Sequence, residues 1–247
     1  MQWNKTQIKQ HKKAAEILGK IIKYVAEFIK NNSYATEVEV RQFIKTQYKK
    51  YHLISDKQKS IVAFNKNTSN VHYFTEQLCK LKNNNLIMVD IWAKLAEKNA
   101  PFADITWMLY YGKNLPKQYA DIFRIVAKAR DKAINYLRNN LKRKIIPIGK
   151  DIDAIARNYL DKHGYGDKFL HSAGHSLGFT SPHGKRVLIN RKGRQSLPLN
   201  VGYTIEPGIY FKNKFGVRSE INFFINKNYK LIITTKIQKK IIKISAY

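Results

Sequence analysis

The sequence predicts an α+β fold, and two observations lead to this. Through most of the first two thirds of the 247-residue chain, apolar residues recur at helical spacing with lysines between them. The last third instead alternates β-branched and aromatic residues with Gly, Asn and Pro, as strands and hairpins do. No Ser/Pro-rich linker, repeat or change of composition separates the two parts. We therefore expect residues 1–247 to form one domain.

Helices are predicted where apolar residues return every three, four or seven positions. The second of them carries the pattern of a capping box, with Glu39 three residues after Thr36. The last is expected to end at Gly164, a usual helix stop. The predicted helices are residues 5–31, 33–53, 117–141 and 148–166.

Strands are predicted between and after these helices. Residues 60–74 read as a strand that leads into a turn. Residues 83–95 read as a strand whose apolar run, Leu86 to Val89, is typical of burial on both faces. The remaining strands are expected in the last third of the chain.

The chain is strongly basic, with 46 Lys and Arg against 17 Asp and Glu and a formal charge of +29. Such a balance suits nucleic acid or an anionic membrane surface. The alternative is a drift of the whole composition toward Lys, Asn and Ile. The basic residues are scattered and accompany no nucleic-acid-binding motif, which favours drift. Nucleic-acid binding is therefore expected to be weak and non-specific.

A reducing compartment is expected, because Cys79 is the only cysteine and no intrachain disulfide can form. Cys79 is interpreted as a partly buried spacer, not a nucleophile. The N-terminal residues contain no apolar signal-peptide core, and no uncharged apolar run approaches the ~20 residues that span a bilayer. We expect a cytoplasmic protein without a membrane partner.

Two glutamates stand out in the basic last third. From Lys168 to Tyr247, Glu206 and Glu220 are the only acidic residues among fifteen lysines and arginines. Strand alternation places Arg218, Glu220 and Asn222 on one face, and a neighbouring strand can bring Glu206 to the same spot. Buried carboxylates need a metal, protons or a cationic partner, so nearby lysines are the alternative to a metal site.

Further ligand-type residues lie upstream. Asp90 is expected to end the buried strand, and Asp104 is expected near a turn. Three of the chain's seven histidines, His171, His175 and His183, fall within the Gly-rich segment 171–184. Such a cluster indicates a metal or catalytic site more strongly than a lone histidine. Four carboxylates and one imidazole form a hard ligand set that suits two divalent ions about 3.5–4 Å apart.

The motifs GHSLG, TIEPGIY and FGVRSE, preceded by VDIWAK and ADITW, resemble those of the pita-bread metallopeptidases. This family includes methionine aminopeptidase, aminopeptidase P and prolidase, and the resemblance covers essentially the whole chain. It implies a curved, mainly antiparallel sheet covered by helices, without a separate N-terminal accessory domain here. It also implies that one ion is held by Asp90, the other by His175 and Glu206, with Asp104 and Glu220 bridging.

The resemblance also implies roles for residues around the metals. His72 would face the substrate, and His171 and Arg218 match positions of the proline-directed members. Glu206 would shuttle the proton and His183 would stabilise the oxyanion. His183 lies one residue beyond the position that the family pattern gives to its second histidine, so this role requires a one-residue bulge.

Other departures are a longer segment between the two aspartates, Ala103 in place of a serine, and Ile221 where a carboxylate often follows the last glutamate. The resemblance implies an aminopeptidase that cleaves short peptides, favouring Xaa-Pro bonds, through a hydroxide that bridges two metal ions. Manganese is the first expectation, and cobalt, zinc or iron would also be accepted. The alternatives are methionine aminopeptidase activity and a silent pita-bread module that binds nucleic acid. The chain could form a homodimer.

Overall fold

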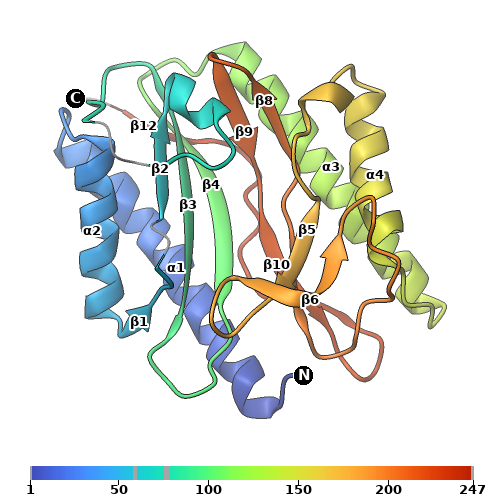
Figure 1. The fold of residues 1–247 in the computed structure, drawn as a ribbon. Coiled ribbons are helices and arrows are strands. Elements are labelled where there is room, and N and C mark those ends of the chain that lie inside the picture. The colour runs from blue at the N-terminus through green and yellow to red at the C-terminus, as the bar shows by residue number, and fades with distance from the viewer. Residues whose placement is uncertain (1, 58–59, 75–77, 246–247) are drawn as a thin grey trace.

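The computed structural model describes residues 2–57, 60–74 and 78–245. Helices α1 and α2 lie on one side of the molecule and α3 and α4 on the other, with the strands between them (Figure 1). Helices precede and interrupt the strands, and most strands pair antiparallel. The predicted α+β class is confirmed.

The helices form where the sequence predicts them, with ends that differ by a few residues. The capping box of α2 is present, because Thr36 Oγ1 accepts from Glu39 N at 3.1 Å and Glu39 Oε2 accepts from Thr36 N at 2.7 Å. Within the described residues, none of the helices is long and apolar enough to cross a membrane. The helices are α1 (Lys5–Asn31), α2 (Glu37–Lys50), α3 (Lys117–Lys142) and α4 (Gly149–Asp161), with the 3₁₀ helices η1 (Asn65–Ser69) and η2 (Gly166–Lys168).

The strands make two five-stranded sheets and one hairpin. The first sheet has the order β1-β3-β4-β12, with β2 also paired to β3, and the second has the order β11-β10-β7-β5-β6. Strands β8 and β9 form the hairpin. Their bounds are β1 (Leu53–Ile54), β2 (Ile61–Phe64), β3 (Asn85–Leu95), β4 (Ala103–Tyr111), β5 (Gly174–Leu177), β6 (His183–Ile189), β7 (Gly202–Ile205), β8 (Gly208–Phe211), β9 (Phe215–Arg218), β10 (Ile221–Ile225), β11 (Leu231–Ile233) and β12 (Ile242–Ile244).

Strand β3 separates two hydrophobic cores. Ile87 and Val89 pack in the core beneath α1 and α2, whereas Leu86 and Met88 belong to the core beneath α3 and α4. This follows from the two-residue repeat of a strand, and it confirms the expected burial on both faces.

The expected positions of the two aspartates were wrong. Asp90 does not end its strand, because β3 continues to Leu95 in register with β4. Asp104 lies on β4, opposite Trp92, and not in a turn. The strands continue because alternate residues such as Ile91 and Ala93 still pack in the core beneath α1 and α2, while Asp90 faces the other way.

Asn222 joins the two large sheets next to Asp104. Its Oδ1 accepts from Asp104 N at 2.9 Å, and its Nδ2 donates to Asp104 O at 2.7 Å. These bonds fix β10 against β4, so ligand-type residues of both sheets face a shared space.

Candidate metal centre

A cavity of about 390 Å³ opens between the sheets. Its walls combine apolar side chains with the carboxylates and histidines that the sequence singles out. Ligand-type residues reach it from β3, β4 and β5, from the end of β7 and from the link between β9 and β10. The lining residues include Ile61, Val71, His72, Asp90, Trp92, Asp104, Leu170, His171, His175, His183, Leu188, Glu206, Arg218 and Glu220.

Asp90 and Glu220 are bridged by Thr106. The Thr106 hydroxyl lies 2.9 Å from Asp90 Oδ1 and 2.9 Å from Glu220 Oε2, and it accepts from Arg218 Nε at 3.0 Å. The guanidinium of Arg218 also donates through Nη2 to Asp90 Oδ2. Arg218 is thus the cation that partly balances this side of the cavity.

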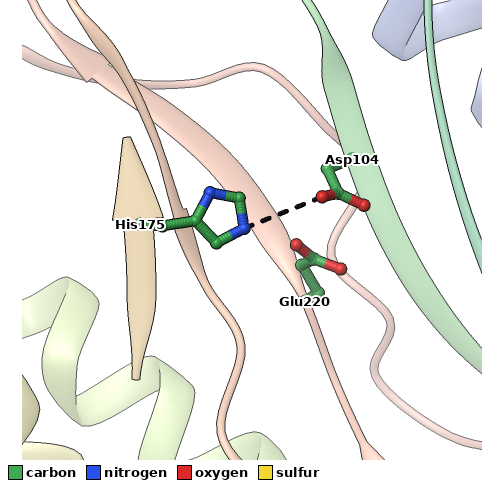
Figure 2. A group of neighbouring side chains, drawn as sticks. All are labelled: Asp104, His175 and Glu220. Carbon is green, nitrogen blue, oxygen red and sulfur yellow. Dashed lines mark ion pairs between the residues drawn. The ribbon is translucent and has the colours of Figure 1, made fainter. Parts of the chain in front are cut away.

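Asp104, His175 and Glu220 form the tightest ligand-type group. Each is buried, and one candidate ligand atom from each lies within 4.8 Å of the others. Figure 2 shows the three side chains pointing toward one point, with His175 Nε2 3.7 Å from Asp104 Oδ2. Three separate chain segments therefore converge where a single ion could lie.

Glu206 extends this group at the same ring nitrogen of His175. Its Oε1 lies 3.2 Å from His175 Nε2 and accepts from Thr204 Oγ1 at 2.9 Å. His175 Nδ1 lies 3.0 Å from Ser176 O, which suits an Nδ1–H donor. In that tautomer of the neutral ring, Nε2 carries no hydrogen and its lone pair is available to a metal ion.

Burial and neighbouring charges shift the pKa values of the groups in this cluster. Burial raises the pKa of Asp104 well above its usual range, and the charge of Asp90 adds to the rise. Burial likewise raises the pKa of Glu220, helped by the charge of Asp104. At His175 burial opposes the proton, but the bond and charge of Glu206 outweigh it and raise the pKa to about 9. Burial would raise the pKa of Glu206, but contact with His175 outweighs it and lowers that pKa.

His171 belongs to a hydrogen-bonded chain along one wall. Arg218 Nη1 donates to Tyr210 Oη at 3.4 Å, and Tyr210 Oη lies 2.9 Å from His171 Nε2. His171 Nδ1 lies 2.9 Å from Ser172 O, so Nε2 can accept from the phenol. Burial lowers the pKa of His171 to about 4, which leaves the ring neutral at pH 7.

His72 and His183 lie at the mouth of the cavity, and both side chains are exposed. The ring centroids of His183 and His175 are 4.1 Å apart. The pairing register of β5 and β6 shifts between His175 and Leu177, which is opposite His183. This irregularity lies between His175 and His183 in the chain, and the two rings are adjacent at the cavity mouth.

Comparison with known proteins decides the family. The model of metallopeptidase family M24 matches residues 9–227. The chain belongs to metallopeptidase family M24. The pita-bread fold that the motifs predict is therefore confirmed, and so is the resemblance to the metallopeptidase family that they carry.

Curated relatives are similar over most of this chain. An uncharacterized peptidase of Methanocaldococcus jannaschii is 32% identical over 227 residues, which are 91% of this chain and 61% of the relative. One of Staphylococcus epidermidis is 30% identical over 223 residues, which are 90% of this chain and 59% of the relative. The chain spans about three fifths of the length of these curated relatives.

Solved peptidase structures superpose closely on this chain. A prolidase from Thermococcus sibiricus matches with a TM-score of 0.84 and 28% identity, over 97% of this chain and 61% of the other. An X-Pro aminopeptidase from Thermotoga maritima matches with a TM-score of 0.84 and 26% identity, over 98% of this chain and 64% of the other.

The residues of this M24 chain fit a group of divalent cations. Four carboxylates line the cavity and Arg218 pairs with one of them, so the ionised carboxylates would bury net negative charge. Glu220 Oε1 is buried and has no hydrogen-bond partner among the described residues. An orphaned carboxylate oxygen within this ligand-type group is what a cation would satisfy.

The motif-based prediction missed three polar residues of the M24 site. Thr106 follows Asp104 by two residues on the same strand face, which is a signal that alternation could have supplied. Tyr210 ends the motif TIEPGIY, although only its glutamate had been assigned. Trp92 follows Asp90 by two residues and walls the cavity, with Nε1 donating to Asp56 Oδ1 at 2.8 Å.

Proposed function

We propose that this chain is the catalytic part of a dinuclear metal-dependent aminopeptidase that cleaves Xaa-Pro bonds of short peptides. The observation that carries this proposal is the convergence of four carboxylates and one imidazole on one cavity, beside Arg218, Tyr210 and His171. The ligands proposed for the two ions are Asp90, Asp104, His175, Glu206 and Glu220. Manganese is the ion to try first, and cobalt, zinc and iron suit the same oxygen and nitrogen donors.

When bound, two divalent ions would supply Lewis-acid activation of a water molecule and of the scissile carbonyl. The chain's own residues would do the rest. Glu206 is ionised because His175 lowers its pKa, so it can accept a proton from the attacking water. His183 lies against His175 at the cavity mouth, where an imidazole N–H can stabilise the developing oxyanion.

The rest of the cavity would hold the peptide. His72 and His171 are proposed to position it, and Arg218 holds Asp90 and Tyr210 in place. Apolar walls from Ile61, Val71 and Leu188 suit a proline ring. Because a proline nitrogen carries no hydrogen, such a site must recognise ring shape and the surrounding carbonyl and carboxylate groups.

The testing experiment compares kcat/KM for Ala-Pro-Ala with that for Met-Gly-Met-Met, with manganese and with cobalt. A ratio well above one with either ion is expected. A ratio below one with both ions would assign methionine aminopeptidase activity instead. No hydrolysis of either peptide by protein that holds two ions would overturn the peptidase proposal for this chain and favour the silent module.

A further inference from the structure

His72 lies in the segment between β2 and β3. This segment begins with η1 and continues through Asn70, whose Oδ1 accepts from His72 N at 3.2 Å. The His72 side chain is exposed at the cavity mouth, and the next side chain, Tyr73, is buried. Where His72 lies therefore depends on how the segment around it is held.

A buried carboxylate on another element holds that segment. Glu37 is the first residue of α2 and is fully buried. Its Oε1 accepts from Phe64 N at 2.5 Å and from Asn67 Nδ2 at 3.0 Å, and its Oε2 accepts from Tyr73 Oη at 2.6 Å. One side chain thus binds the end of β2, η1 and the residue after His72.

The donors around Glu37 also support one another. Asn67 Nδ2 lies 2.8 Å from Tyr73 Oη and 3.1 Å from Glu37 Oε2. Burial raises the pKa of Glu37, and the bonds from Tyr73, Asn67 and Phe64 act against that rise. A buried carboxylate is costly unless donors satisfy it, so this arrangement favours a single conformation of the segment.

A second anchor fixes the other side of η1 to the strand that carries Arg218. Gly216 N on β9 donates to Thr68 Oγ1 at 2.7 Å. A Cβ atom at position 216 would lie 2.2 Å from Thr68 O, so only glycine allows this approach. The segment is therefore held both by α2 and by a strand of the cavity wall.

We propose that Glu37 and Tyr73 are positioning residues that hold His72 at the mouth of the M24 site. This inference rests on the proposed function, since it assigns to His72 a contact with the peptide. Burial of the Tyr73 phenol against Glu37 fixes the backbone next to His72, so the imidazole faces the cavity. Neither residue lines the cavity itself.

The mildest perturbation is Tyr73→Phe, which removes one hydroxyl and leaves the ring and the other donors to Glu37. Glu37→Gln is harsher, because its new N–H₂ group would face atoms that are themselves donors. Tyr110→Phe is the matched control. The Tyr110 hydroxyl lies 3.0 Å from Asn84 Oδ1 and 2.9 Å from Asn114 O, away from the cavity lining.

The test is a double-mutant cycle with His72→Ala on Ala-Pro-Ala. Tyr73→Phe should lower kcat/KM by about tenfold in the wild-type background, the size of a lost positioning contact, and by less than twofold when His72 is already alanine. Tyr110→Phe should change kcat/KM by less than twofold in both backgrounds. An equal loss from Tyr73→Phe in both backgrounds would overturn the inference, because the phenol would then act independently of His72.

A readout without turnover separates this inference from the proposed function. In a ¹H–¹⁵N spectrum of the histidine rings, the His72→Ala variant assigns the His72 signal. Tyr73→Phe should shift or broaden that signal and leave those of His171 and His175 in place. An unchanged His72 signal would refute positioning even in active protein. If the wild-type protein is inactive but Tyr73→Phe still shifts the His72 signal, only the proposed function is refuted.

Discussion

Binding of divalent ions should release protons, and the structure sets how many. Four ionised carboxylates carry a charge of −4 and the Arg218 guanidinium carries +1, which leaves −3 when His175 is neutral. Such a charge is too costly to bury without compensation, so protons are the alternative to metal. Burial and like charges raise the pKa of Asp104 and of Glu220 well above their usual ranges, and contact with Glu206 raises that of His175 to about 9.

Three protons, on Asp104, Glu220 and His175, would bring the metal-free site to neutrality. Ligands must lose their protons to bind a metal. We therefore expect two to three protons to be released per chain at pH 7 as two ions bind, with apparent affinity that rises with pH.

The assay is isothermal titration of chelator-treated protein with Mn²⁺ at pH 7, in buffers of different ionisation enthalpy. The dependence of the observed heat on buffer enthalpy gives the proton count. Glu27→Gln, which alters an exposed residue of α1, is the control and should release the same number. Glu220→Gln should release at least one proton fewer and should bind fewer ions. Binding of two ions without proton release would refute the electrostatic reasoning.

Three further outcomes are expected. Glu206→Gln should lower kcat roughly a hundred- to ten-thousandfold on Ala-Pro-Ala with little change in the melting curve, since it removes the proton acceptor but keeps the size; wild-type turnover would exclude Glu206 as the base. The metal-free protein should become less stable between pH 6.5 and 9, because a raised His175 pKa contributes stability below 6.5 that is lost as pH rises through about 9. In thermal melts His175 alone would account for a loss of about 3 kcal/mol over this range, and the raised pKa values of Asp104 and Glu220 act in the same direction. A melting temperature that rises with pH would contradict the sign. RNA binding should be weak and fall steeply with salt, and a tight complex at high salt would favour a nucleic-acid function for the +29 charge.

Local sequence determined the helices and the types of residue at the site. Helical periodicity and the Thr36 capping box depend only on neighbours three or four positions apart, so they are readable without a structure. The five ligand-type residues lie in short motifs that fix their chemistry. The single strand expected through Arg218 and Glu220 is divided in the structure, since β9 ends at Arg218 and β10 begins at Ile221, but both side chains line the cavity.

Tertiary structure decided how far the strands extend and which distant residues meet. Asp104 lies within β4 and not in a turn because pairing with β3 begins at Ala103, which no local signal at Asp104 encodes. Thr106 meets Glu220 although 114 residues separate them, because the two sheets pack together. Glu37 reaches Tyr73 across 36 residues because α2 packs against β2 and the segment that follows it. Hydrogen bonds between far-separated residues depend on the packing of whole elements, and packing is a property of the folded chain and not of any one segment.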